Sequence, residues 1–181
     1  MSNKELEQKI IEESKIVKDF PRAGVNFINL APVFENIELY GEIIEEMTER
    51  IAEYNIDKIV AIESRGFLLG SPLALASEKP LVLARKGGKV PYKPVNQEYS
   101  LEYGKASLEI SEPQINEGDR IAIVDDIIAT GGTAEATIKI IEKLKGKAVC
   151  LVVLGSISNL DYKNLLSKYN IEIISLVDYK F

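Results

Sequence analysis

Two adjacent carboxylates and a glycine turn form the segment of this 181-residue chain that is best suited to chemistry. Asp125 and Asp126 follow an apolar run, and the turn Thr130-Gly-Gly-Thr133 comes shortly after them. Glycines let the backbone approach an anion closely, and N–H groups at a helix start point toward it. The turn therefore predicts a cradle for one phosphate, while the carboxylates suit sugar hydroxyls, a Mg²⁺ ion or a developing cation. A solvated acidic pair beside a glycine turn is the alternative; each is common alone, but the combination favours a ligand site.

Two groups of cations follow other apolar runs. Arg85, Lys86 and Lys89 lie within five positions of an otherwise acidic chain. Clustered cations suit a polyanion such as pyrophosphate, and arginine can bind two oxygens at once. An ordinary basic surface loop is the alternative for this group. The motif Ser64-Arg65-Gly66 adds another cation and a glycine at the start of a predicted helix.

The composition narrows the chemistry further. The chain has no histidine, which excludes a Ser-His-Asp triad, a His-supported thiolate and a His-bearing zinc site. Its one cysteine, Cys150, stands in an apolar run, so we expect a buried core residue, no intrachain disulfide and a cytoplasmic location. The net charge of −6 argues against a nucleic-acid partner. Neither a signal peptide nor a long apolar run is present, so we expect no membrane partner.

The elements that must position these residues alternate along the chain. Apolar spacing predicts helices over residues 3–18, 37–54, 67–76 and 133–145, and strands over 58–62, 81–84, 121–124, 149–153 and 171–177. Strands that are apolar on both faces and alternate with helices indicate the α/β class, with a mostly parallel twisted sheet flanked by helices. Ligands bind such sheets at the carboxyl ends of the strands, where all three polar groups lie. Residues 86–106 show no periodicity, which predicts a functional flap or mobile loop.

A longer pattern in these segments resembles a known family. Residues 121–133, Ile-Ala-Ile-Val-Asp-Asp-Ile-Ile-Ala-Thr-Gly-Gly-Thr, resemble the phosphoribosyl-pyrophosphate (PRPP) signature of the type I phosphoribosyltransferases. The other motifs are similar, in order and spacing, to those of the adenine phosphoribosyltransferases: Asp19-Phe20-Pro21, Gly24-Val25 with Phe27, Glu63-Ser-Arg-Gly-Phe67, Arg85-Lys86 with Gly88-Lys89, and Tyr99-Ser-Leu-Glu-Tyr-Gly104. The resemblance extends from about residue 19 to 146. It implies a single domain over 1–181, with residues about 1–35 as an N-terminal hood and about 86–106 as a flexible flap.

The resemblance implies a Mg²⁺-dependent transfer of 5-phosphoribose from PRPP to adenine, giving AMP and pyrophosphate, in a homodimer. By the same resemblance, the 5′-phosphate and ribose would be bound by Asp125, Asp126, Ala129, Thr130, Gly131, Gly132 and Thr133. Pyrophosphate would be met by Ser64, Arg65, Arg85, Lys86 and Lys89. Phe27 and Ile128 would sandwich the base, and the backbone near Asn26 would read its edge. Glu102 would exchange a proton with the purine ring, and Mg²⁺ would be held mainly through the substrate.

Four positions depart from the family pattern. Ile28, Asn29 and Ala31 stand where the adenine enzymes commonly carry a basic residue, an aspartate and a hydroxyl residue, and Gly87 stands where a third basic residue is frequent. These departures bear on substrate choice and efficiency more than on the class of reaction. The alternatives are therefore transfer to another purine base (hypoxanthine, guanine or xanthine) and a non-catalytic, PRPP-sensing regulator of the same fold. An unrelated flavodoxin-like domain is the remaining one.

Overall fold

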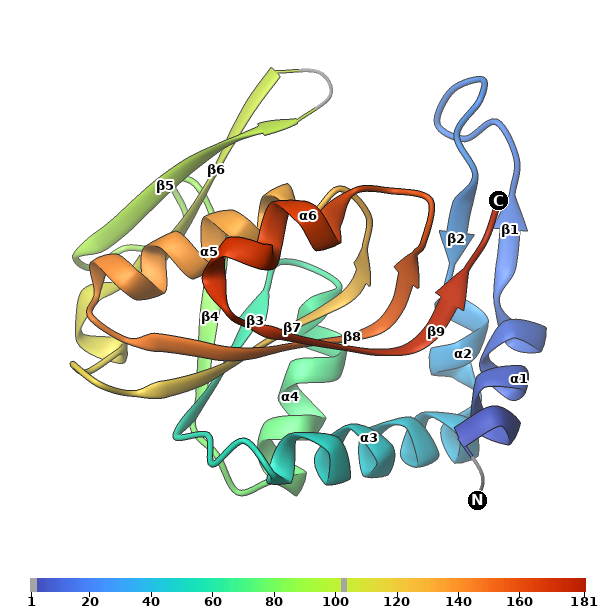
Figure 1. The fold of residues 1–181 in the computed structure, drawn as a ribbon, viewed down its shortest axis with the longest axis horizontal. Helices are drawn as coiled ribbons and strands as arrows, with labels where there is room; N and C mark the ends of the chain where they lie inside the picture. The colour runs from blue at the N-terminus through green and yellow to red at the C-terminus, as the bar shows by residue number, and fades with distance from the viewer. Residues whose placement is uncertain (1–2, 102–103) are drawn as a thin grey trace.

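A central sheet organises the molecule. In the computed structural model, which describes residues 3–101 and 104–181, seven strands form this sheet in the order β5-β6-β4-β3-β7-β8-β9 (Figure 1). The strands β3, β4, β7, β8 and β9 are parallel to their neighbours in this group, whereas β5 and β6 pair antiparallel with each other and β6 pairs antiparallel with β4. Their bounds are β3 Lys58–Ile62, β4 Leu81–Lys86, β5 Pro94–Leu101, β6 Gly104–Ser111, β7 Arg120–Ile128, β8 Lys147–Ile157 and β9 Glu172–Tyr179.

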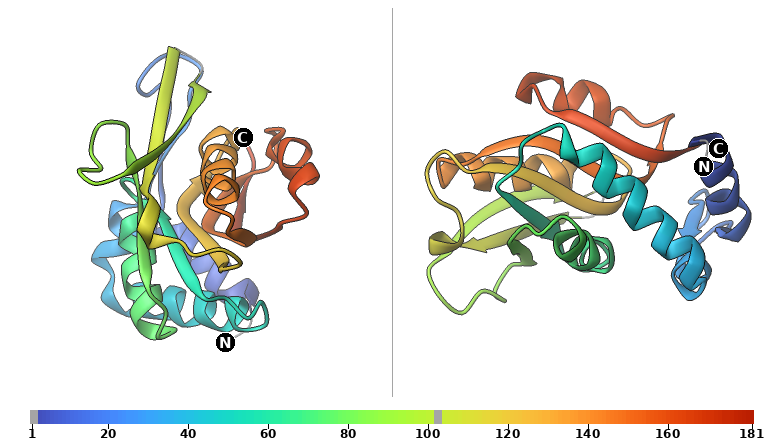
Figure 2. Two further views of the ribbon diagram at one scale, coloured as in Figure 1. Left: turned by 90° about the vertical axis from the view of Figure 1, so that its left-hand side faces the viewer. Right: turned by 90° about the horizontal axis from the view of Figure 1, so that it is seen from below.

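Helices cover both faces of this sheet, as Figures 1 and 2 show. The helices are α1 Asn3–Glu13, α2 Ala31–Glu35, α3 Ile37–Ala52, α4 Gly66–Ala76, α5 Gly132–Lys143 and α6 Tyr162–Leu166, with 3₁₀ turns at Glu112–Gln114 and Ser167–Tyr169. Successive residues of β7 enter different cores: Ala122 and Val124 pack in the α3–α4 layer, and Ile121 and Ile123 pack in the α5 layer. The strand is therefore buried on both faces, which confirms the α/β prediction.

In two segments the kind of structure differs from the one that the sequence predicted. The first helix ends at Glu13 because Lys15–Val17 forms β1, which pairs antiparallel with β2, Phe27–Asn29. The loop predicted over 86–106 is wrong in part, since β4 continues to Lys86 and most of the remainder belongs to the β5–β6 hairpin. Residues on β5 alternate between half-buried and exposed, but Gln97 occupies one of the inner positions between Val95 and Tyr99. A polar residue at an inner position breaks the alternation of apolar and polar residues by which a strand is recognised in a sequence.

The order of the strands places the functional edge of the sheet. After β4 the chain returns to form β7 on the opposite side of β3, so a topological switch point lies between β3 and β7. Ligand crevices of open α/β sheets form at the carboxyl ends of strands beside such a point. The β1–β2 and β5–β6 hairpins project from the sheet on the same side of the molecule (Figures 1 and 2). Over the described residues, no helix has the length and apolar character needed to cross a membrane.

Candidate active site

A cavity of about 820 Å³ opens at the switch point and brings together the three polar groups that the sequence singled out. Its lining comes from the turns after β3 and β4, from the β5–β6 hairpin, and from β7 with the start of α5. The lining residues are Glu63, Ser64, Arg65, Lys86, Gly87, Gly88, Glu98, Tyr99, Ala106, Ser107, Glu109, Asp125, Asp126, Ile127 and Thr133. The three strand exits therefore converge on one site, as the parallel-sheet argument predicted.

Asp125 and Asp126 form the acidic side of this cavity. They lie inside β7, which continues to Ile128, and not after the strand as the apolar pattern suggested. Asp125 Oδ1 accepts a hydrogen bond from the Asp126 N–H at 2.9 Å, and Arg65 Nε lies 2.8 Å from Asp126 Oδ2. Burial, followed by the charge of Asp126, raises the pKa of Asp125 well above its usual range. Burial also raises the pKa of Asp126, against the lowering effect of Arg65. The pair therefore favours a hydrogen-bond donor or positive charge placed against it.

Gly66 lets the Ser64-Arg65 turn lie against the backbone that carries Asp125. A Cβ on Gly66 would meet Val124 O at 2.7 Å and Asp125 Cα at 3.1 Å. Backbone atoms of a central strand cannot move aside as the end of a flexible side chain can, so position 66 admits only glycine at this separation. Because Gly66 has no side chain, the Ser64-Arg65 turn can lie close to the acidic pair on β7.

Gly66→Ala is expected to destabilise the protein by about 2 kcal/mol, because the added methyl group forces the turn away from β7. The matched control is Gly41→Ala on α3, where an added Cβ meets no atom within 4 Å. That variant should gain stability by about 1 kcal/mol through helix propensity. Urea unfolding of both variants measures the difference. Equal effects of the two substitutions would contradict the close approach at Gly66.

The phosphate turn lies between β7 and α5. Gly131 adopts φ +84° and is the N-cap of α5, and none of the described side chains caps this helix. The backbone conformation of Gly131 therefore favours glycine, and the packing is tight, since an added Cβ would meet Tyr162 Cβ at 3.1 Å. A smaller cavity of about 100 Å³ borders Ala129, Thr130, Gly131 and Thr133. The first N–H groups of α5 thus remain available to an anion at this turn.

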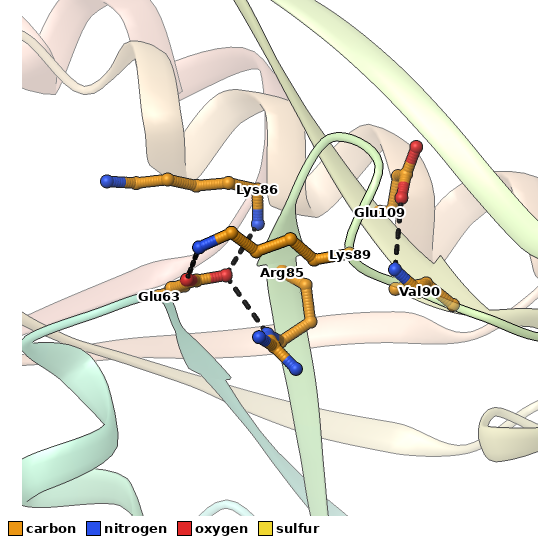
Figure 3. Close-up of polar contacts among 6 residues, drawn as sticks. All are labelled: Glu63, Arg85, Lys86, Lys89, Val90 and Glu109. Atoms are coloured by element: carbon orange, nitrogen blue, oxygen red, sulfur yellow. Dashed lines mark hydrogen bonds and ion pairs between the residues drawn. The ribbon is translucent and has the colours of Figure 1, made fainter.

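The cation cluster contains a carboxylate that the sequence interpretation missed (Figure 3). Glu63 accepts hydrogen bonds from Arg85 Nε at 3.0 Å, from the Lys86 N–H at 2.8 Å and from Lys89 Nζ at 2.7 Å. Its side chain is only 8% exposed. Burial alone would raise the pKa of Glu63, but the hydrogen bonds from Lys89, Lys86 and Arg85 together lower it to about 2. The sequence placed Glu63 at the start of the motif Glu63-Ser-Arg-Gly-Phe67, but it gave this carboxylate no role.

Removal of the Glu63 charge is expected to change the acid stability of the protein. The pKa of Glu63 is lowered from its ordinary 4.5 to about 2 in the folded state, so its contribution to stability is present above about pH 4.5 and is lost as the pH falls toward 2. The difference in unfolding free energy between the wild type and Glu63→Gln should therefore shrink over that window. Urea unfolding at a series of acidic pH values checks it, and a constant difference would show that the carboxylate is not held as described.

Glu109 is a second carboxylate that the sequence interpretation missed. It lies on β6 opposite Arg85 and is buried. Its carboxylate accepts the Val90 N–H at 3.4 Å and Asn96 Nδ2 at 3.2 Å. A hydrogen bond from the Gly88 N–H makes the largest contribution to lowering the pKa of Glu109, against the opposing effect of burial. The loop that carries Lys89 therefore has a buried anion beneath its backbone as well as one beneath its side chains.

The residues predicted to bind the base, Asn26, Phe27 and Ile128, do not line the large cavity. Phe27 contacts Phe20 edge-on with ring centroids 5.3 Å apart, and the Arg65 guanidinium lies 5.5 Å from the centroid of the Phe27 ring. Ile128 is buried and borders the smaller cavity at the phosphate turn. Asn26 directly precedes β2. Glu102, the predicted proton carrier, lies outside the described residues.

Comparison with known proteins assigns this arrangement to a family. Residues 31–179 match the family described as phosphoribosyl transferase domain. The chain belongs to the phosphoribosyltransferase family. It is 43% identical over 156 residues to the adenine phosphoribosyltransferase of Thermotoga petrophila, with 86% of this chain and 92% of that relative covered.

Solved phosphoribosyltransferases have the same fold. The crystal structure of adenine phosphoribosyltransferase from Thermoanaerobacter pseudethanolicus is similar with a TM-score of 0.91 and 37% identity, covering 95% of this chain and 99% of that one. The Saccharomyces cerevisiae enzyme, complexed with D-2,5-dideoxy-2,5-imino-altritol 1,6-bisphosphate and adenine, gives a TM-score of 0.88 at 34% identity, with coverages of 96% and 99%. The predicted type I phosphoribosyltransferase fold is thereby confirmed.

The structure gives a local account of three departures from the phosphoribosyltransferase pattern. Ile28 is buried in the core beside α1 and α2, where a charged side chain would lose its hydration. Asn29 Oδ1 accepts the Ala31 N–H at 3.1 Å, so this amide supplies an acceptor at the start of α2. A Cβ on Gly87 would overlap Ser107 Oγ, which leaves no room for a longer side chain unless Ser107 turns away. Nothing in the structure explains the alanine at position 31.

Proposed function

We propose that this protein transfers 5-phosphoribose from PRPP to adenine, forming AMP and pyrophosphate, and so serves purine salvage. The proposal rests on a cavity where the acidic pair meets Lys86 of the cation cluster and Thr133 of the phosphate turn, while the rest of that turn borders the smaller cavity beside it. PRPP presents a sugar between a 5′-phosphate and a pyrophosphate, so its three parts correspond to these three groups. The yeast relative's complex with adenine and a bisphosphate supports the same assignment.

The reaction breaks the bond between the anomeric carbon of ribose and pyrophosphate. Positive charge develops on the sugar and negative charge on the departing oxygen, and preorganised charges lower the free energy of such a transition state. Asp125 and Asp126 accept hydrogen bonds from the ribose hydroxyls and face the positive sugar. Ser64, Arg65, Arg85, Lys86 and Lys89 bind the departing pyrophosphate. Backbone N–H groups from Ala129 to Thr133 hold the 5′-phosphate and fix the sugar between them.

A Mg²⁺ ion fits this donor set if the substrate supplies most of its ligands. Asp126 Oδ2 is buried and accepts no hydrogen bond of good geometry from any described residue, although Arg65 Nε lies 2.8 Å from it; a cation or hydroxyl bound there would share this oxygen with Arg65. The described residues contain no cluster of three metal-ligating side chains, and Mg²⁺ is commonly bound by one or two carboxylates together with substrate phosphates. When bound, the ion neutralises charge on the pyrophosphate oxygens.

Glu102 is the proposed acid–base residue, on the strength of the family resemblance. A carboxyl group in a closed, dry site can have its pKa raised enough to share a proton with a ring nitrogen of the base. Phe27 and Ile128 stack on the base, and the backbone near Asn26 reads its edge.

We extend the proposal to a cytoplasmic homodimer with a single domain, a hood over about 1–35 and a flap over about 86–106. Light scattering that shows a monomer would contradict the dimer.

A competition assay tests the base preference. The protein is incubated with PRPP, Mg²⁺ and equal concentrations of adenine, hypoxanthine, guanine and xanthine, and the nucleotides are separated and quantified. AMP is the expected main product, and EDTA should stop its formation. A different main nucleotide would move the assignment to that purine, the alternative that the departures at Ile28 and Asn29 leave open. Binding of PRPP without turnover of any base would favour the non-catalytic regulator.

A further inference from the structure

Two buried carboxylates hold the cation cluster from opposite sides, and neither has a place in the transfer reaction described above. Glu63 bonds to the side chains of Arg85 and Lys89, and Glu109 bonds to the backbone around Gly88. We propose that Glu63 and Glu109 are positioning residues that fix the cation turn, residues 85–90, in the geometry that receives pyrophosphate. The inference rests on the proposed function, because it assigns pyrophosphate to this turn.

Glu63 is itself fixed, so it can fix its partners. The Glu63 N–H donates to Ala84 O at 2.9 Å, which ties its backbone to β4 directly beside Arg85. Its carboxylate is nearly buried and has three donors, whereas the side chains of Arg85 and Lys89 are 34% and 49% exposed. Exposed arginine and lysine side chains sample many rotamers, and ordering each one costs free energy on binding. A rigid acceptor for Arg85 Nε and Lys89 Nζ removes part of that cost before the ligand arrives.

The Glu63 carboxylate does not use up the donors that a second anion needs. Arginine has five N–H donors and lysine has three, and Glu63 takes the Nε hydrogen of Arg85 and one ammonium hydrogen of Lys89. From Lys86 it takes only the backbone N–H, and Figure 3 shows the Lys86 ammonium group apart from the Glu63 carboxylate. The three cations outnumber the two carboxylates, Glu63 and Glu109, so the cluster still attracts an anion. This distribution favours positioning over competition with the ligand.

The Glu109 carboxylate binds the backbone of the same cation turn. Gly88 adopts φ +81°, which reverses the chain between Lys86 and Val90. The Glu109 carboxylate accepts the Val90 N–H, and Asn96 on β5 donates to Glu109 from the other side at 3.2 Å. The Gly87 N–H also donates to Ser107 O at 2.9 Å. The turn is therefore tied to β6, and through Asn96 to β5, at the place where Lys89 leaves the backbone.

Carboxylate-to-amide variants test the proposal, with pyrophosphate as the probe. Glu63→Gln keeps one acceptor oxygen but turns an NH₂ group toward a cation, so one of Arg85 and Lys89 loses its partner. The expected result is an affinity for Mg²⁺-pyrophosphate about tenfold weaker by calorimetry and a KM for PRPP raised to a similar degree. Affinity for AMP, which lacks the pyrophosphate group, should change less than about threefold. Glu109→Gln is expected to show the same selective loss.

The control is Asp119→Asn, which removes a comparable carboxylate outside the cavity. Asp119 precedes β7 at its amino end, lies 2.7 Å from Lys58 Nζ and accepts the Asn116 N–H at 2.7 Å. Burial opposes these bonds, yet the pKa of Asp119 is lowered, as it is for Glu63. Asp119→Asn should lower the melting temperature without changing the ratio of pyrophosphate affinity to AMP affinity. Glu63→Asp, which keeps the charge at a shorter reach, replaces Glu63→Gln if the latter does not fold, and it should show a smaller loss of the same kind.

Two results would overturn the inference. One is wild-type or tighter binding of Mg²⁺-pyrophosphate by Glu63→Gln or its replacement Glu63→Asp, which would make Glu63 a competitor. The other is an equal loss of pyrophosphate and AMP affinity, which is the signature of a merely structural role. Failure of the proposed function has a different signature, because the wild-type protein itself would then form no AMP from PRPP and adenine.

Discussion

Replacement of Asp125 and Asp126 together by asparagine is expected to lower kcat/KM for PRPP by about 10²–10⁴-fold. Each carboxylate offers a charged acceptor to a ribose hydroxyl in the proposed complex, and a charge-assisted hydrogen bond is worth about 1.5–3 kcal/mol. Their negative charge also faces the sugar as positive charge develops on it. Steady-state kinetics with PRPP varied at saturating adenine measures the loss. A double variant within about threefold of the wild type would show that the acidic pair does not touch the ribose.

The stability of the single variants separates charge from fold. Burial and the neighbouring Asp126 charge raise the pKa of Asp125, so the ionised Asp125 costs stability increasingly as the pH rises through that pKa. Asp125→Asn keeps the Oδ1 acceptor for the Asp126 N–H and should therefore melt a few degrees above the wild type at neutral pH. Asp126→Asn should gain less, because it also loses the ion pair with Arg65. A lower melting temperature for Asp125→Asn would contradict this account.

Glu102→Gln is expected to lower kcat by about 10²–10⁴-fold while the affinity for PRPP is nearly kept. Glutamine cannot exchange a proton with the purine ring, but it does not alter the phosphate turn or the cation cluster. Rapid-quench measurement of AMP formation, with PRPP affinity by calorimetry, separates the two effects.

The matched control for this variant is Glu112→Gln, which makes the same exchange at an exposed residue just beyond β6. Glu112 Oε2 lies 3.6 Å from Lys93 Nζ, and Glu112 does not border the cavity. Its kcat should equal that of the wild type. An undiminished kcat in Glu102→Gln would remove Glu102 from the mechanism.

Hydrophobic periodicity predicted much of the fold. The run Lys58–Ile62 is buried on both faces and forms β3 with the bounds that its apolar residues predicted. The periodicity did not predict the β5–β6 hairpin. Gln97 interrupts the inner face of β5, and the pairing of β6 with β4 joins residues that are distant in sequence. The end of the first helix was missed for a similar reason, since pairing with β2 overrides local helix propensity after Glu13.

The sequence predicted those site residues that have a chemically suitable side chain and also stand at the carboxyl end of a predicted strand. Ser64, Arg65, Asp125, Asp126 and Thr133 all border one cavity because the carboxyl ends of adjacent parallel strands meet. The supporting carboxylates could not be found in this way. Glu109 stands between the apolar residues Leu108 and Ile110 in the sequence, and only the pairing of β6 with β4 places it beneath the cation turn. The roles of Phe27, Ile128 and Glu102 depend on resemblance and stay predictions.

The proposed transfer reaction is tested by mixing the protein with PRPP, Mg²⁺ and adenine and measuring AMP and pyrophosphate together over time. Both products are expected to accumulate in equal amounts, and neither is expected to form when adenine is omitted. Hydrolysis alone would release pyrophosphate without AMP. Absence of AMP at any protein concentration, from a sample that binds PRPP, would contradict the proposed transfer reaction.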